Sequence, residues 1–350
     1  LKVNPNGVAD NDFVFILGYP GKTFRHRPAQ YIEYQQKFLL PYTSELNDFQ
    51  NQKMMEAGQN DKATELALAT RIKRNANVLK NYRGKLKGLR NIDLISSKKE
   101  EDKALTQFIQ SNPELKAKYG SLMQDIDLHY QLVFTDAARE LWFNNLYTGI
   151  RTYEIANLVN QLKAATAKYK TTAQQNEFFN KHIDKLKNEL DAIYESYDVT
   201  ADQQIAAHMF AQAYNMKGKN TLQTVANKNF ASAEAASAYS TALIQQSKLN
   251  NKEKLYTEVL KNASTLSAYS DDILKSQELF DKEHTPFKEE LKRREGILNK
   301  LMGDYVAVKE LYQDKNFIPD ANSTLRLAFG NIKGYSPTDA VYMEPFTTVK

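Results

Sequence analysis

Proline is distributed very unevenly along this chain of 350 residues. Four of the nine prolines lie before residue 42 and four lie after residue 285, so Pro113 is the single proline between them. A proline inside a helix costs roughly 3 kcal/mol, so a long stretch with one proline is what a helical region requires. The middle of the chain, rich in good helix formers, is therefore predicted to be mainly α-helical.

Apolar residues at alternating spacings of three and four predict two long amphipathic helices. One seam is Phe179, Ile183, Leu186, Leu190, Ile193 and Tyr197. The other is Phe287, Leu291, Leu298, Leu301, Tyr305, Val308 and Tyr312, with Arg294 in its one gap. Such seams are typical of helices that pack nearly antiparallel, and the second helix is expected over about residues 286 to 314.

Four local patterns are expected to start helices. Asn112-Pro113 and Thr285-Pro286 each place a capping residue before a proline suited to the first turn. The pairs Thr171/Gln174 and Thr200/Gln203 have the spacing of a capping box.

The two ends of the chain are expected to form strands. Residues 12–18 are a short apolar run before Gly-Tyr-Pro-Gly, which predicts a buried strand entering a tight turn. Residues 323–330 alternate over their middle, and residues 340–342 follow a Tyr-Ser-Pro-Thr-Asp turn. We expect residues 1–27 to be a β segment and hinge, residues 28–318 a helical domain, and residues 319–350 returning strands.

The helical domain is therefore expected to be inserted into a β domain of which this chain holds only a few strands. The points near Arg25 and Pro319, where the insertion would begin and end, should then lie close together. Because the chain starts at Leu1 rather than Met and ends in a strand-like run, we expect it to be an internal piece of a longer protein.

Several classes of function find little support in the sequence. Cysteine is absent, and no two of the five histidines have the i, i+4 spacing of a helical zinc site, so no metal or cofactor is expected. Gly21-Lys22-Thr23 does not complete a phosphate-loop motif, because Ile16 stands where that motif needs glycine. A net charge of +5 does not favour nucleic acid, and no apolar run is long enough to span a membrane.

The sharpest anomaly is a run without acidic residues from Leu66 to Ile92. Its eight cations are Arg71, Lys73, Arg74, Lys80, Arg83, Lys85, Lys87 and Arg90. One interpretation is a basic helix face paired with acidic neighbours elsewhere in the fold. The other is the lining of a cleft for an anionic or carboxylate-bearing ligand.

Three blocks of the chain resemble a known family. Residues 12–25 resemble the Asp-Phe-Val-Phe-x-x-Gly-Tyr-Pro-Gly-x-Thr-x-Arg segment of bacterial serine dipeptidyl aminopeptidases of the dipeptidyl-peptidase 7 and 11 type. Residues 319–327 and 341–348 are similar to the block that follows the helical domain of these enzymes. An internal block, Asn77-Val78-Leu79-Lys80-Asn81 with Gly84 and Gly88, matches a third, although many members have Tyr-Trp in place of Val78-Leu79.

This resemblance implies a chymotrypsin-like double β-barrel capped by a large inserted helical domain. It implies an enzyme exported to the periplasm or cell surface of Gram-negative bacteria, a homodimer as a full-length protein. Such enzymes remove dipeptides from the free N-termini of peptides with a Ser-His-Asp triad. All three triad residues would lie outside this chain, which would supply the cap and be inactive alone.

The resemblance assigns one binding residue, Asn77, whose family counterpart helps to hold the α-amino group of the substrate. The alternative for Asn77 is an ordinary asparagine on a helix surface, and a small slip of register would put Asn75 or Asn81 in its place. The alternative for the whole chain is a stand-alone helical interaction or scaffold module without catalysis. That alternative explains the helical seams but not the blocks at the two ends.

Overall fold

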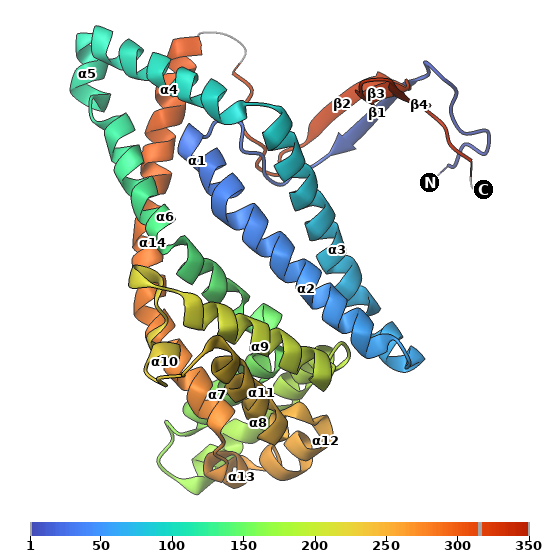
Figure 1. Cartoon of the computed structure of the whole chain (residues 1–350), viewed down its shortest axis with the longest axis vertical. Helices are drawn as coiled ribbons and strands as arrows, with labels where there is room; N and C mark the ends of the chain where they lie inside the picture. Colours follow the sequence, from blue (N-terminus) through green and yellow to red (C-terminus); the bar gives the residue numbers. More distant parts are fainter. Residues whose placement is uncertain (1, 314–316, 349–350) are drawn as a thin grey trace. The chain divides into compact units, whose positions relative to one another are not determined.

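The computed structural model describes residues 2–313 and 317–348, and these are mainly helical, as the proline pattern predicted (Figure 1). The chain divides into two compact units. One is Pro28–Val308, and the other joins Leu1–Arg27 to Lys309–Lys350. The boundary between Val308 and Lys309 falls inside a helix that ends at Gln313.

The helical unit is built from long helices joined by short turns. Its first half contains α1 (Ala29–Tyr34), the π-helical turn η1 (Gln35–Leu39), α2 (Leu40–Gly58), α3 (Lys62–Asn91), α4 (Leu94–Ser111), α5 (Pro113–Tyr119) and α6 (Leu122–Gly149). Next come α7 (Arg151–Thr166), α8 (Thr172–Tyr194), α9 (Val199–Asn215), η2 (Gly218–Asn220), α10 (Gln223–Ala226) and α11 (Ala233–Gln246). The last are η3 (Lys248–Asn250), α12 (Lys252–Lys254), η4 (Leu255–Val259), α13 (Ala263–Ala268) and α14 (Asp272–Gln313).

Two of the four predicted helix starts are confirmed. The Asn112 side chain accepts hydrogen bonds from the backbone N–H groups of Glu114 and Leu115 at the start of α5. Thr171 and Gln174 form a complete capping box at the start of α8.

The other two predicted starts are wrong. Asp198, not Thr200, caps α9, because its side chain accepts from the backbone N–H of Ala201. Pro286 lies inside α14 rather than at its start. Phe280 and Phe287 stand on either side of this proline and are both buried in the same core cluster. Burial of two such rings offsets the roughly 3 kcal/mol that an internal proline costs.

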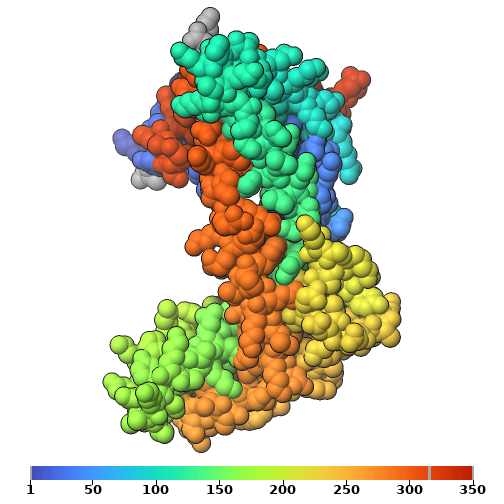
Figure 2. Space-filling view, turned by 90° about the vertical axis from the view of Figure 1, so that its left-hand side faces the viewer, coloured from blue at the N-terminus to red at the C-terminus, as the bar shows by residue number. Residues whose placement is uncertain are grey.

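The helical unit has two main apolar clusters, and α6 and α14 contribute to both. The larger cluster includes Trp142 and Phe143 of α6 and Phe280 of α14, while the smaller one includes Tyr130 of α6 and Tyr305 of α14. In Figure 2, α14 (orange) runs beside α6 (green), and Figure 1 shows the same pairing. These two helices are therefore the common support of the unit.

The predicted seams are largely confirmed. Five residues of the first seam, Phe179, Ile183, Leu186, Leu190 and Ile193, are buried on α8, and Tyr197 lies beyond its end. The gap in the second seam is explained by an ion pair: the Arg294 guanidinium binds Asp136 of α6 and Glu290 one turn back on α14.

The second unit contains two antiparallel pairs of strands. Strand β1 (Phe13–Gly18) pairs with β2 (Arg326–Asn331), and β3 (Tyr335–Thr338) pairs with β4 (Val341–Met343). The strands predicted near residues 12–18, 323–330 and 340–342 are confirmed. Residues 335–338, which were assigned to a turn, form β3 instead, and the turn is confined to Asp339 and Ala340.

The expected proximity of the two connections is confirmed within this unit. The Asp320 carboxylate accepts from the backbone N–H of Arg25 at 2.8 Å and from the Thr23 hydroxyl at 2.7 Å. The chain thus leaves and re-enters the β unit at neighbouring points.

The prediction that β1 is buried is wrong for this chain. The side chains of Phe13, Phe15 and Leu17 on one face and Ile16 on the other remain more than half exposed. A sheet of two strands has no second layer to cover either face, so the apolar run stays in contact with solvent.

Candidate functional site

Helix α3 carries the basic run and the asparagine singled out in the sequence, so the candidate site is built on it. Asp61 starts the helix, because its side chain accepts from the backbone N–H of Ala63 at 3.0 Å. The helix then runs antiparallel to α2 as a hairpin (Figure 1). Leu68 of α3 is buried against Met54 of α2 in a small apolar cluster of their own.

Polar contacts fix how α3 is turned about its own axis. The Asn75 amide donates to the Gln50 side-chain oxygen of α2 at 3.0 Å, and both residues are buried. The Asn51 amide of α2 donates to the backbone carbonyl of Ile72 at 3.2 Å. Asn75 is therefore committed to packing and is not available to a ligand.

Asn77 lies on the opposite, exposed face of α3, and its side chain makes no hydrogen bond to any other described residue. At about 100° per residue, Asn77, Asn81, Gly84 and Gly88 fall within an arc of about 60°. These four residues of the internal block thus share one face, whereas Leu79 of the same block is buried on the other side of the helix. Of the two neighbouring asparagines, Asn81 alone shares that face with Asn77.

The basic run fits neither of its two interpretations throughout. Arg71 is buried and donates to the backbone carbonyl of Gly149 at 2.8 Å, so it belongs to the fold. Arg83 pairs with Asp48 of α2 at 2.7 Å. The remaining six are exposed and form no ion pair with any described residue: Lys73, Arg74, Lys80, Lys85, Lys87 and Arg90.

Part of the run lines a groove, as the cleft interpretation expected. A hollow of about 540 Å³ lies between the start of α2 and the end of α3. Its lining is Gln36, Pro41, Ser44, Glu45, Arg83, Leu86, Lys87 and Arg90. Because Arg83 is paired with Asp48, Lys87 and Arg90 are the cations that face Glu45 there, and the groove still suits an anionic group.

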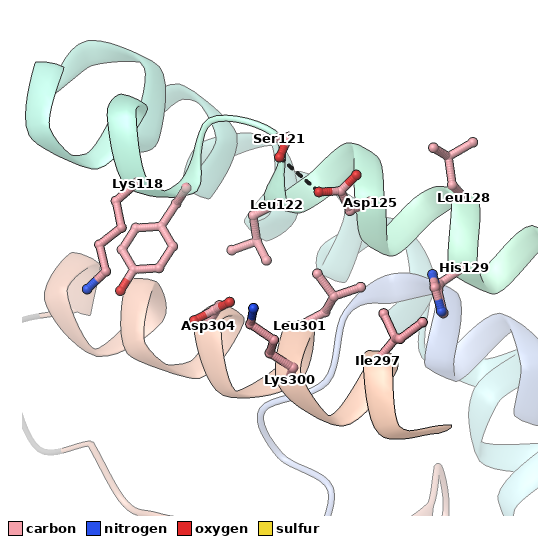
Figure 3. Close-up of a pocket in the computed structure, with 11 residues that line it drawn as sticks. Lys118, Ser121, Leu122, Asp125, Leu128, His129, Ile297, Lys300, Leu301 and Asp304 are labelled. Atoms are coloured by element: carbon pink, nitrogen blue, oxygen red, sulfur yellow. Dashed lines mark hydrogen bonds between the residues drawn. The ribbon is translucent and has the colours of Figure 1, made fainter. Parts of the chain in front are cut away.

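Two other hollows lie along α6 and α14. One, of about 350 Å³, has Lys118 and Lys300 balanced by Asp125 and Asp304, and the Ser121 hydroxyl donates to Asp125 (Figure 3). The other, of about 620 Å³, is lined by residues of α1, α6 and α14 that include Glu140. Burial, with the charges of Asp136 and Glu295, raises the pKa of the Glu140 carboxyl.

Residues 2–313 and 317–348 do not bring together the histidine–serine pair of a Ser-His-Asp triad. Within that part of the chain, no histidine ring hydrogen-bonds to a serine; His182, for example, contacts the backbone carbonyl of Phe178. The same residues contain no group of three His, Asp or Glu side chains placed to hold a metal ion.

Comparison with known proteins agrees with the blocks found in the sequence. Residues 1–350 match the family model described as Peptidase S46. The chain belongs to the peptidase S46 family. The Asp/Glu-specific dipeptidyl-peptidase of Flavobacterium psychrophilum is 26% identical over 356 residues, covering 99% of this chain and 48% of that relative. Dipeptidyl-peptidase 7 of Capnocytophaga gingivalis is 27% identical over 336 residues, covering 95% and 46%.

The fold of this S46 chain is also that of a solved structure. Porphyromonas endodontalis DPP11 in complex with the dipeptide Arg-Glu matches with a TM-score of 0.77 at 19% identity, over 98% of this chain and 48% of DPP11. The S46 chain thus spans about half the length of the relatives it matches.

Sequence reasoning missed the role of Arg71, which it grouped with the other cations of the S46 chain. The signal was present in the spacing, because Leu68, Arg71, Asn75 and Leu79 recur every three or four residues and all are buried. An arginine within such a stripe faces the fold, whereas its neighbour Arg74 faces solvent.

Proposed function

We propose that this chain is the helical cap portion of an exported serine-type dipeptidyl peptidase that removes dipeptides from the free N-terminus of peptides. Membership of the peptidase S46 family and relatives named as dipeptidyl peptidases support this proposal. The observation that carries it is the place of Asn77, which stands unpaired among the described residues on the accessible face of a helix whose rotation is fixed.

The chemistry of this site follows from the need to recognise a chain end. A free N-terminus is an ammonium group with hydrogen-bond donors and no acceptor, and an asparagine side-chain oxygen is a neutral acceptor for it. A hydrogen bond to a charged group contributes about 1.5–3 kcal/mol. Asn77 can thus select unblocked peptides, while the cap closes the cleft over them.

Bond cleavage is assigned to residues outside this chain. A serine attacks the peptide carbonyl, a histidine takes its proton, and an aspartate orients the histidine. In the proposal these residues belong to a chymotrypsin-like double β-barrel, to which β1 to β4 contribute strands. The exposed apolar faces of β1 support this, since further layers of a barrel would cover them.

The test is kinetic and uses the full-length enzyme with an unblocked peptide substrate. Asn77→Ala should lower kcat/KM by about 10- to 100-fold, the loss of one hydrogen bond to a charged group. Asn81→Ala, one turn further along the same face, is the matched control and should change it little. A large loss in Asn81→Ala alone would move the assignment by one turn, and no loss in either variant would overturn it.

The groove at the end of α3 suggests a preference among substrates. We propose that Lys87 and Arg90, exposed and unpaired among the described residues, favour peptides that carry carboxylates. Reversing both to Glu in the full-length enzyme should weaken cleavage of acidic peptides most. An equal loss on neutral peptides would contradict this preference. Arg71 is unsuitable for such a test because it is buried.

The location and assembly of the full-length enzyme are part of the same proposal. It should occur in the periplasm or at the cell surface of a Gram-negative bacterium, and it should be a homodimer. Within the described part of this chain, every helix is too short or too polar to cross a lipid bilayer. Cell fractionation and sedimentation of the purified enzyme test these two statements, and a cytoplasmic monomer would contradict both.

A further inference from the structure

Arg71 of α3 reaches the end of α6. Its side chain is 4% exposed and donates to the backbone carbonyl of Gly149 at 2.8 Å, with the carbonyl of Thr148 at 3.5 Å. The last carbonyls of a helix have no partner within it, and a cation there also interacts favourably with the helix dipole. Arg71 therefore supplies from α3 what the C-terminus of α6 lacks.

Asp202 of α9 supplies the missing partner at the other side of the junction, where it accepts from the first N–H groups of α7. Ile150, which precedes α7, makes no side-chain cap. Instead the buried Asp202 carboxylate accepts from the backbone N–H of Arg151 at 2.7 Å and from that of Thr152 at 2.9 Å. The junction between α6 and α7 is thus held by a cation from one side and an anion from the other.

The two charges act on each other through this junction. Burial, followed by the charge of Arg151, lowers the pKa of Arg71 to about 10, and the charge of Asp202 opposes that shift. Arg71 forms no ion pair with a described carboxylate, so its binding partners are backbone carbonyls at fixed positions.

A short turn joins α3 to α2, and the contacts of Ile72, Asn75 and Arg83 hold the two helices together, whereas Arg71 ties α3 to α6. The apolar cluster of α3 is small, with Leu68 packed against Met54 and Ala201. Apolar contact is not directional and tolerates a small slide or rotation, whereas a hydrogen bond does not. The register of α3 therefore depends on its polar contacts as well as on its packing against α2, and those polar contacts include the ones of Arg71 and Asn75.

These two polar contacts meet at a place with no spare room. Gln50, which accepts from Asn75, also has its side-chain nitrogen against Gly149. A Cβ atom added to Gly149 would lie 2.9 Å from the Met209 sulfur and 3.3 Å from the Gln50 nitrogen. Because the side chains at this junction have no room to move, a displacement of the Arg71 side chain would displace the backbone of α3 as well.

We infer that Arg71 is a positioning residue for the substrate-binding face of α3. By binding the final carbonyls of α6 it fixes the register of α3, and with it the place of the Asn77 side chain. The two residues are six apart, about 9 Å along the helix axis. This inference rests on the proposed role of Asn77 in holding the substrate α-amino group.

The experiment is a double-mutant cycle in the full-length enzyme, with KM and kcat measured on an unblocked peptide. Arg71→Lys keeps the charge but loses the forked guanidinium, so it should raise KM by about tenfold. In the Asn77→Ala background the same change should have no further effect, because the group that Arg71 positions is gone. Arg74→Lys, one turn along on the exposed face, is the matched control and should change neither background.

Each other outcome overturns the inference. The same fold-change from Arg71→Lys in both backgrounds means that it acts on the enzyme as a whole and not through Asn77. If Arg71→Lys leaves KM unchanged in the enzyme that keeps Asn77, Arg71 does not position anything that the reaction uses. An unaltered kcat/KM in Asn77→Ala itself would overturn the proposed function, and the inference with it.

A second variant keeps the test valid if Arg71→Lys does not fold. Asn75→Ala breaks another buried polar contact of α3, the one to Gln50, and leaves no buried cation behind. The same cycle with Asn77→Ala should again show a rise in KM that disappears when Asn77 is absent. Persistence of that rise in the double variant would refute the positioning of this face by its polar contacts.

Discussion

At the scale of single residues, Asp202 shows how one side chain can serve two helices. It lies within α9 and yet caps α7, where it also accepts a hydrogen bond from the Thr152 hydroxyl at 2.6 Å. Burial raises the pKa of its carboxyl, and the hydrogen bonds from Thr152 and the charge of Arg71 oppose that rise. The local price of a buried carboxylate is thus offset by the donors that surround it.

Removing that side chain should therefore be costly. Asp202→Ala leaves the backbone N–H groups of Arg151 and Thr152 without their acceptor, and it removes the larger of the negative charges that act on the buried Arg71. We expect the free energy of unfolding to fall by about 3–5 kcal/mol. Urea unfolding followed by circular dichroism measures this.

Asp272 provides the comparison, because its pair with Lys275 is on the surface. Asp272→Ala should change the free energy of unfolding by less than about 1 kcal/mol. A similar small change in Asp202→Ala would contradict the account of the junction between α6 and α7.

Arg71 also marks what could be predicted for the candidate site. The sequence located the basic run, its lack of acidic residues and the asparagine within it, because these are local features. It did not separate Arg71 from the surface cations, because the acceptor of Arg71 is Gly149, 78 residues away in the chain. A charge count treats all cations alike, and burial is decided by such distant partners.

At the scale of elements, α14 owes its continuity to packing rather than to local preference. Phe280 is fully buried and its ring lies against four others, with centroids 5.1 Å from Trp142, 6.4 Å from Phe143 and 5.8 Å from both Tyr153 and Phe210. These contacts hold the helix N-terminal to Pro286. The sequence predicted a start at Pro286 because it weighed the proline and not the rings.

Two adjacent residues of α14 give a matched test of this point. Phe280→Ala should lower the free energy of unfolding by about 3–5 kcal/mol, because it removes a buried ring and leaves a cavity. Leu279→Ala changes a side chain that is 44% exposed and should cost less than about 1 kcal/mol. Thermal or urea unfolding of both variants measures the difference, and equal effects would refute the packing argument.

The error at α9 has a different cause. Thr200 and Gln203 have the spacing of a capping box, but Asp198 offers an equally good cap two residues earlier, and its side chain makes the hydrogen bond. Local patterns of this kind overlap, and tertiary contacts choose between them. At the starts of α8 and α5 the predicted Thr171 and Asn112 make the caps, although Thr172 and Ser111 stand beside them.

At the scale of the whole molecule, the helical nature of the chain and the strands at its ends were predictable, while the surroundings of the strands were not. Prolines and periodic seams mark the helical part, and the two outer blocks pair as β1 and β2. Phe15 stands opposite Phe329, and both rings are more than half exposed. In the proposed full-length enzyme the layers of a β-barrel cover such residues.

This difference can be measured in the full-length enzyme. If barrel layers cover the sheet, Phe15→Ala removes a buried ring and should lower stability by about 3–5 kcal/mol. If the face meets solvent, the variant loses only a cross-strand contact worth up to about 1 kcal/mol. Val3→Ala is the control, since Val3 is 83% exposed and outside the strands. A small effect in Phe15→Ala would contradict the barrel.

The central claim is that this helical unit reads the free amino terminus of a peptide, and one comparison tests it most directly. Dipeptide release by the full-length enzyme should be measured on a peptide with a free N-terminus and on the same peptide with that terminus acetylated, for the natural enzyme and for Asn77→Ala. We predict strong selectivity for the free peptide in the natural enzyme and a loss of most of that selectivity in Asn77→Ala. Selectivity that Asn77→Ala leaves intact would contradict the claim.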